Sequence, residues 1–211
     1  MHPRILPFLA FLALVTVSCG GGDDDGDAKT ESSTTASTTV APLEFELKRG
    51  DVAVASTGGD VALDEKVQEA VVDASQKYIE LAVLGPIVDG EVGKGYGKLF
   101  DASVKDAATG ADRAGLTDAG IPQATGTPTI TSTPVRVDAI ADGFGQILLL
   151  ATTFDLDVRA ETKNGDMSVV RNNELTFAPG ANGKWLVTAY RVSAKRDLPK
   201  AKTTTTTVDE G

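Results

Sequence analysis

The chain has 211 residues and a formal charge of −10, which leaves room for one ordinary folded domain. Its lysines and arginines do not gather into a basic face, apart from the pair Lys195 and Arg196. This excludes nucleic acid as the expected partner, because phosphate binding needs concentrated positive charge. The only cysteine, Cys19, has no second thiol with which to form an internal disulfide.

Residues 1–18 are predicted to be a signal peptide. Arg4 supplies positive charge, and the stretch 5–17 is apolar apart from Pro7 and Thr16. That stretch is too short for a membrane span, which needs about 20 residues. It has the length of a signal-peptide core.

The residues Thr16, Val17, Ser18 and Cys19 resemble the bacterial lipobox, although leucine is usual at the first position. The resemblance implies that the thiol of Cys19 carries a diacylglyceryl group and that the chain is cut before it. Two acyl chains anchor a protein stably. The expected location is therefore the cell membrane, at its extracytoplasmic face. The alternative is an ordinary cleaved signal that leaves a free cysteine.

The segment 19–42 is rich in Gly, Asp, Ser and Thr and has no apolar periodicity, which predicts a disordered tether. Its run Asp23-Asp24-Asp25 is interpreted as solvated charge and not as a metal site. The Thr-rich tail 199–211 is also predicted to be disordered. The folded domain is expected over 43–198.

The first elements of the domain are predicted to be a hairpin and a long helix. Arg49-Gly50-Asp51 should turn between strands at 43–48 and 52–56. Asp64 is a good N-cap, and the apolar residues after it recur at helical spacing. Gly85-Pro86 is expected to end this helix.

The glycine-rich middle, 86–126, is expected to be mostly loop. A short helix is predicted at 98–108 and one further turn at 111–116. The run 93–97 contains three glycines but lacks the spacing of nucleotide motifs, so no nucleotide cofactor is expected.

From residue 127 onward the apolar period changes to two, which predicts strands. Four antiparallel strands are expected, at 135–139, 148–162, 167–178 and 184–194. Asn164-Gly165 predicts a type I′ hairpin turn between the second and third. In the last strand, Trp185, Val187 and Ala189 are expected on one face, opposite Leu186, Tyr190 and Val192. The predicted class is α+β: a long N-terminal helix packed on a four-stranded meander, with an extra N-terminal hairpin.

The stretch 135–192 resembles the nuclear-transport-factor-2-like superfamily, the cystatin-like cone. The long alternating strand 148–162, the Asn164-Gly165 hairpin, Glu174-Leu175-Thr176-Phe177 and Gly183-Lys184-Trp185-Leu186-Val187 carry this likeness. The resemblance implies a curved sheet that wraps the helix around a pocket. It also implies that a homodimer through the open sheet face is a candidate assembly.

The residues supply little for catalysis. The only histidine, His2, is lost with the signal, which removes histidine acid–base chemistry and histidine metal ligation. A lone aspartate base with Tyr78 or Tyr190 as oxyanion donor is the remaining catalytic alternative. Tyr78, Trp185 and Tyr190 are the candidate pocket-lining residues, with core packing as the alternative. Asp155 and Asp157 are interpreted as solvated charges on the polar strand face.

The leading hypothesis is a membrane-anchored, non-enzymatic binding or scaffolding module. Its expected partners are the membrane, through the lipid, and an envelope protein or a small apolar ligand. No catalytic residue, cofactor or metal is expected. The first alternative is a carrier of lipid or another apolar ligand. The second is a pocket enzyme of isomerase or dehydratase type, which would need a buried carboxylate of raised pKa facing a tyrosine.

Overall fold

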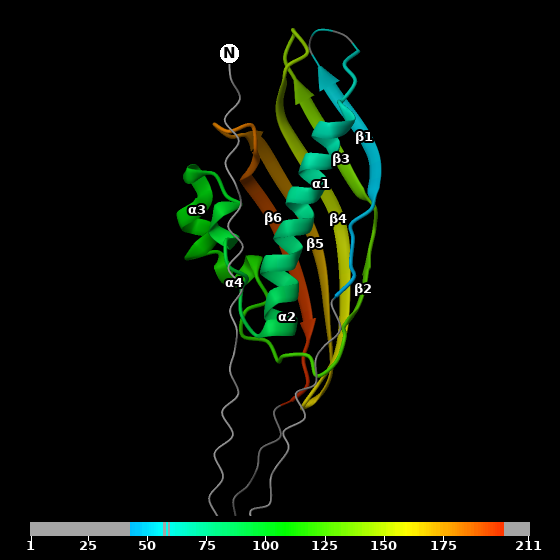
Figure 1. Ribbon diagram of the computed structural model, residues 1–211, viewed down its shortest axis with the longest axis vertical. Helices are drawn as coiled ribbons and strands as arrows, with labels where there is room; N and C mark the ends of the chain where they lie inside the picture. The colour runs from blue at the N-terminus through cyan, green and yellow to red at the C-terminus, as the bar shows by residue number, and fades with distance from the viewer. Residues whose placement is uncertain (1–42, 57, 59, 201–211) are drawn as a thin grey trace, which may run out of the picture. The chain divides into compact units, whose positions relative to one another are not determined.

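The computed structural model describes residues 43–56, 58 and 60–200, which form an α+β fold with one long helix and a mixed sheet of six strands. In Figure 1 the long helix lies across one face of the sheet, and two short helices sit beside β6. The helices are α1 (Glu65–Ile79), α2 (Gly85–Asp89), α3 (Ala102–Thr109) and α4 (Arg113–Leu116). The strands are β1 (Arg49–Ser56), β2 (Thr129–Ser132), β3 (Val135–Ala141), β4 (Ile147–Thr162), β5 (Gly165–Pro179) and β6 (Trp185–Asp197).

The long helix begins as predicted. The Asp64 carboxylate accepts a hydrogen bond from the backbone N–H of Lys66 at 2.8 Å, so Asp64 caps α1. Five α1 residues are buried, which confirms the apolar face expected from the helical spacing: Val71, Val72, Ser75, Tyr78 and Ile79.

The predicted stop at Gly85-Pro86 is wrong, because the helix continues through a π-helical turn. Residues Glu80–Leu84 form this turn, and α2 follows directly, with Pro86 in its first turn. A proline in a regular helix loses a hydrogen bond and clashes with the preceding turn. The wider π turn accommodates it. The helix ends at Gly90, whose φ of 81° is easily reached only by glycine.

The middle of the chain has the two helical pieces that were predicted. The first is split, with a 3-10 turn at Tyr96–Lys98 and α3 beginning after Asp101, whose carboxylate caps the helix through the N–H of Ser103. Between them, Phe100 forms a parallel bridge to Val187 of β6. The segment around Phe100 therefore extends the sheet edge at β6.

The sheet contains the predicted antiparallel strands, which pair in the order β3, β4, β5 and β6. The short strand β2 pairs with the C-terminal half of β4, and β3 pairs with its N-terminal half. β2 and β3 therefore follow one another along the same edge of β4. Pro134 separates them, and proline has no N–H to contribute to a ladder.

The predicted N-terminal hairpin is wrong. Arg49-Gly50-Asp51 lies inside β1, which pairs in parallel with β3 at the edge of the sheet. The pairing register shifts between Arg49 and Val52. A Cβ on Gly50 would lie 3.0 Å from the backbone oxygen of Val135, so this glycine permits close approach of two strands and does not make a turn.

The β4–β5 hairpin is present, but its turn is not the predicted type I′. Thr162 pairs with Gly165, which leaves Lys163 and Asn164 as the turn residues. A type I′ turn needs positive φ at both of them. Among the residues of this turn only Gly165 has positive φ, at 126°.

The predicted faces of the last strand need one correction. The register shifts so that Val187 pairs with Phe177 and Ala189 with Thr176, which leaves Thr188 as a bulge. The bulge changes the alternation by one residue. Tyr190 and Val192 consequently share the helix-facing side of the sheet with Val187, and Ala189 lies on the opposite side.

The core lies between α1 and the facing side of the sheet. Alternate residues of β5 from Met167 to Phe177 point into it, and Arg171 and Asn173 are among them. Asp155 and Arg159 lie on the outer face and are exposed, and Asp157 is half-buried there, as the alternation predicted. The two polar side chains of β5 are therefore the unusual feature of the inner face.

Candidate functional site

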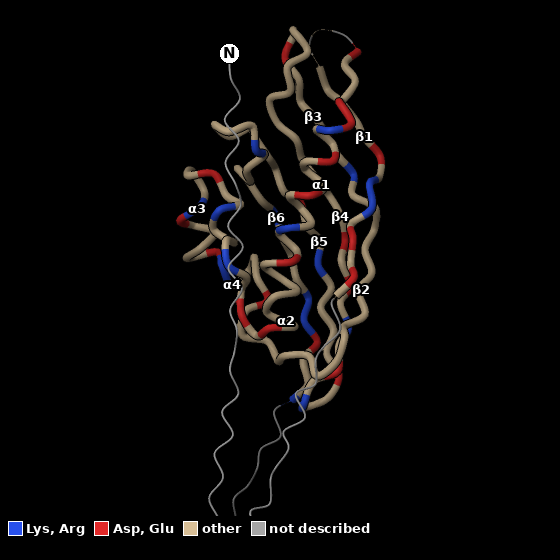
Figure 2. Tube along the Cα trace, in the orientation of Figure 1, with Lys and Arg blue, Asp and Glu red and all other residues tan. Residues whose placement is uncertain are grey.

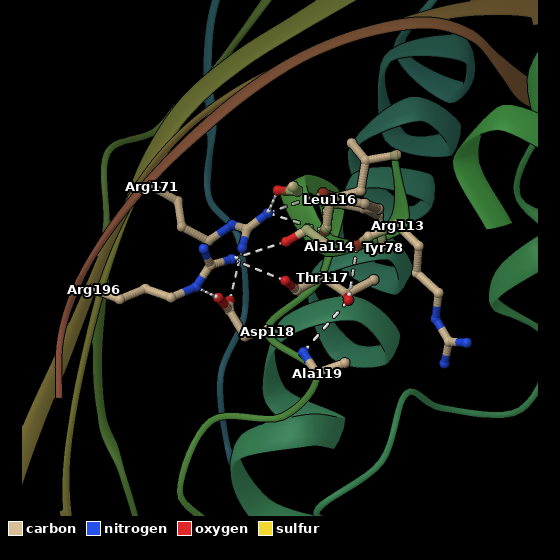
Figure 3. Close-up of polar contacts among 10 residues, drawn as sticks. Tyr78, Arg113, Ala114, Leu116, Thr117, Asp118, Ala119, Arg171 and Arg196 are labelled. Carbon is tan, nitrogen blue, oxygen red and sulfur yellow. Dashed lines mark hydrogen bonds and ion pairs between the residues drawn. The ribbon is translucent and has the colours of Figure 1, made fainter. Parts of the chain in front are cut away.

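The first candidate site is a largely buried cluster of charges, shown in Figure 3. Arg171 Nη1 donates to Asp118 Oδ2 at 2.7 Å, and neither side chain has any exposed surface. Arg196 Nε donates to Asp118 Oδ1 at 2.6 Å and is 25% exposed. Both carboxylate oxygens are thus occupied. We refer to Asp118, Arg171, Arg196 and Tyr78 as the Asp118 network.

The two guanidinium groups also hold the end of α4. A helix leaves its last carbonyl groups without intrahelical partners, and these groups need others when they are buried. Arg171 donates to Leu116 O at 3.0 Å and Arg196 to Thr117 O at 2.9 Å. Longer contacts of 3.5 Å reach Gly115 O from Arg171 and Ala114 O from Arg196. The network therefore fastens α4 to β5 and β6.

Tyr78 completes the network from the long helix. Its hydroxyl donates to Leu116 O at 2.6 Å and accepts from Arg171 at 3.2 Å. Burial raises the pKa of this hydroxyl, against the opposing effect of the Arg171 charge. Tyr78 is fully buried and does not line the groove described below, so its place is that of a core residue.

The network is arranged for structure and not for proton transfer. The Asp118 carboxylate faces two guanidinium groups, and Tyr78 reaches it only through Arg171. Two buried atoms, Arg171 Nε and Asn173 Oδ1, have no hydrogen-bond partner among the described residues. The burial of Arg171 is compensated by its contact with Asp118 and by its hydrogen bonds to Leu116 O and the Tyr78 hydroxyl.

The second candidate site is a surface groove between α4 and β6, with a volume of about 400 Å³. We call it the α4–β6 groove. Tyr190 lines it, and its hydroxyl donates to Asp112 Oδ2 at 2.7 Å across the groove. A Cβ added to Gly115 would meet nothing within 4 Å, so this position opens into free space. The lining residues are Ala111, Asp112, Gly115, Leu116, Tyr190, Arg191 and Val192.

An aromatic row connects the two sites. Ring centroids are 6.5 Å apart for Tyr78 and Tyr96, 5.0 Å for Tyr96 and Phe100, and 6.0 Å for Phe100 and Tyr190. The last two pairs meet edge to face, which is a favourable arrangement for aromatic rings. The row fixes the Tyr190 ring at the floor of the groove.

The three residues proposed for a pocket therefore separate. Tyr190 lines the α4–β6 groove, Tyr78 lies in the core at the other end of the aromatic row, and Trp185 is half-buried against the core without lining the groove. Arg171, Asp118, Arg196 and Asp112 were not foreseen. The sequence did contain a signal for Arg171. In the alternation of β5, Arg171 falls on the same face as Val169 and Leu175, and that inner face is otherwise mainly apolar.

The tyrosines should resist alkaline ionisation in the folded protein. Burial, then the hydrogen bond to Asp112, raises the pKa of Tyr190 to about 12. Burial also raises the pKa values of Tyr78 and Tyr96. An unfolded tyrosine releases its proton near pH 10. Because the pKa values are higher in the folded state, the contribution of these tyrosines to stability is fully present below pH 10. It is lost as the pH rises above 10 through the folded pKa values.

Ultraviolet absorbance of tyrosinate measures this directly. We expect little tyrosinate signal near pH 10 in the native protein and about half ionisation of the three tyrosines at that pH in denaturant. Asp112→Asn should lower the pKa of Tyr190, because the substitution replaces a charged acceptor of the hydroxyl proton with a neutral one. A native titration that matches the denatured one would contradict the placement of these rings.

Some features lie outside the described residues or have no counterpart among them. Cys19, the signal segment 1–18, the tether and the tail from residue 201 are outside them. Within the described part, no group of three His, Cys, Asp or Glu side chains could hold a metal ion. Nor does that part contain a helix with the length and apolar character needed to cross a membrane.

The chain was compared with protein-family models, with curated proteins and with solved structures, and nothing matched in any of the three comparisons.

Proposed function

We propose that the chain is an exported lipoprotein, anchored through Cys19 at the extracytoplasmic face of the cell membrane, whose domain is a non-enzymatic binding module. The α4–β6 groove is the proposed binding site. The observation that supports binding is the groove itself, with an aromatic floor and a carboxylate on one wall. Concave sites that are largely formed in advance are the usual places for ligands.

The groove is preformed because lining residues from both α4 and β6 are held in place by other parts of the fold. The Asp118 network fixes the end of α4, and the aromatic row fixes Tyr190. A site whose walls are already ordered loses little entropy when a ligand enters. The groove is therefore better suited to binding a partner than to a mechanism that requires conformational change.

The groove supports a binding role better than the alternative of an enzyme. The buried carboxylate belongs to Asp118, whose two oxygens both face guanidinium groups. The groove carboxylate belongs to Asp112, which is exposed. Neither combines burial with a free oxygen, which a general base of raised pKa would need.

We also propose that the sheet has the curvature of the cystatin-like cone. Support comes from the long strands β4 and β5 and from the position of α1 across one face of the sheet (Figure 1). The parallel strand β1 at the sheet edge is an addition to that plan. A flat sheet would contradict the proposal.

The anchoring proposal is tested by Cys19→Ser in the full-length precursor expressed in a bacterial host. The parent protein should sediment with membranes, and the variant should not, because the thioether to lipid cannot form on serine. Ser32→Ala, a change of similar size in the same segment, should leave fractionation unchanged. Mass spectrometry of the N-terminal peptide should find a diacylglyceryl cysteine in the parent. If the serine variant stays equally firmly in the membrane fraction, anchoring through Cys19 is wrong.

A further inference from the structure

We propose that the α4–β6 groove recognises a primary ammonium group on an aliphatic stem, as a lysine side chain of a partner protein presents it. The proposal rests on the binding function proposed above and names the chemistry of its ligand. It follows from three features of the groove: a carboxylate without a cationic partner, an apolar floor, and neighbouring arginines that are already paired or directed elsewhere.

The carboxylate is that of Asp112, which stands at a helix N-cap but does not cap the helix. Asp112 is the N-cap residue of α4, yet its side chain makes no capping hydrogen bond. The carboxylate is turned instead toward Tyr190, which donates to Oδ2. The ion pairs among the described residues do not include Asp112. Oδ1 is therefore available to a donor that enters the groove, and a cationic donor makes the stronger bond.

The floor of the groove suits an aliphatic stem that ends in a cation. Val192, which is half-buried, supplies apolar surface beside the ring of Tyr190, and Leu116 lies beneath at 3% exposure. Lysine buries its methylene stem on such surface while the ammonium group stays at the polar edge. A cation near the face of a tyrosine ring gains further attraction. The volume of about 400 Å³ leaves room for a lysine side chain.

The arginines near the groove form no ion pair with Asp112 among the described residues. Arg191 pairs with Glu174 at 3.5 Å, and its side chain is 86% exposed. Arg196 is bound to Asp118. Arg113 follows Asp112 directly in α4, and neighbouring helix positions do not face each other.

The charge of the whole chain acts in the same direction. The formal charge of −10 favours the approach of a basic partner. Figure 2 shows acidic positions interspersed with basic ones along the strands and helices. The long-range field therefore favours cations in general, and the selection of an ammonium group falls to Asp112 and Tyr190.

The test compares two small probes that differ only in the ammonium group. Nα-acetyl-lysine methylamide, whose ε-ammonium group is free, and Nα-acetyl-norleucine methylamide are titrated into the full-length Cys19→Ser protein. The readout is the shift of backbone amide NMR signals. We expect the lysine probe to shift signals of residues 111–116 and 190–192 and to bind at least tenfold more tightly than the norleucine probe. Added salt should weaken the lysine probe and leave the norleucine probe unchanged.

Two variants and one matched control locate the effect. Asp112→Asn should reduce affinity for the lysine probe about tenfold or more and leave the norleucine probe unchanged. Gly115→Leu should abolish binding of both, because Gly115 lines the groove and a larger side chain there has open space to occupy. Asp106→Asn removes an exposed carboxylate from neighbouring α3 and should change nothing. Unfolding midpoints of all variants verify that they fold.

Each outcome decides the proposal. Equal binding of the two probes would overturn recognition of ammonium, while binding by the groove would stand. Lysine-probe shifts that survive Asp112→Asn would overturn the role of the carboxylate. No shift with either probe would overturn the proposal altogether, and the fractionation of Cys19→Ser would still decide the anchoring function separately. If Gly115→Leu does not fold, the comparison of the two probes on the parent groove remains decisive.

Discussion

Replacing Asp118 with alanine is expected to lower the free energy of unfolding by about 3–5 kcal/mol, the usual cost of removing one partner from a buried ion pair. Arg171 would keep its charge with no exposed surface and no carboxylate, and Arg196 would lose its acceptor at 2.6 Å. The penalty comes mainly from the desolvated charge that remains and not from the lost attraction. Urea unfolding followed by circular dichroism measures it.

A matched surface pair separates burial from charge. Asp157 pairs with Arg159 at 3.1 Å, but the two side chains are 30% and 73% exposed. Asp157→Ala should therefore cost no more than about 1 kcal/mol. The double variant Asp118→Ala/Arg171→Met should be more stable than Asp118→Ala alone, because it removes the buried charge left without a partner. Equal costs for Asp118→Ala and Asp157→Ala would contradict the burial of the network.

The local elements were predictable because their signals lie close together in the sequence. The N-cap Asp64, the apolar spacing of α1 and the alternation along β4 and β5 each depend on residues within a few positions of one another. The sequence therefore predicted α+β, the helix start and the antiparallel neighbours. These features follow from backbone periodicity alone.

The errors occur where a distant segment decides the local structure. Gly50 reads as a turn residue, but β3 approaches it closely and keeps it in a parallel strand. Gly85-Pro86 reads as a helix stop, but the π turn before it absorbs the proline. The bulge at Thr188 moves Tyr190 onto the inner face. No local pattern distinguishes these cases, because tertiary contacts override propensity.

The candidate site was predictable only in part for the same reason. Tyr190 was singled out as an aromatic residue, and it does line the groove. Its partner Asp112 lies 78 positions away in the sequence, and Asp118 lies 53 positions from Arg171. The alternation along β5 alone could have identified Arg171 as a buried cation that needs an anion. Nothing in the sequence says which of the many acidic residues that anion is.

Phe100→Ala is expected to cost about 3–5 kcal/mol of stability, the range for a large aromatic side chain removed from a core. Phe100 is 4% exposed and packs edge to face on both Tyr96 and Tyr190. Its backbone also extends the sheet edge, since Val187 donates to Leu99 O and Asp101 donates to Val187 O, both at 2.9 Å. A cavity at this position would loosen the packing of α3 against β6. Chemical unfolding measures the loss.

Two further substitutions show what Phe100 contributes. Phe144 is 99% exposed, so Phe144→Ala makes the same chemical change and should leave stability within about 0.5 kcal/mol of the parent. Phe100→Leu keeps most of the volume and should cost less than about 1.5 kcal/mol. It removes the aromatic edge that fixes the Tyr190 ring, so ligand binding in the α4–β6 groove should weaken by more than the loss of stability alone explains. If Phe100→Ala is as mild as Phe144→Ala, the aromatic row does not support the groove, and the groove cannot be the preformed site that a binding function requires.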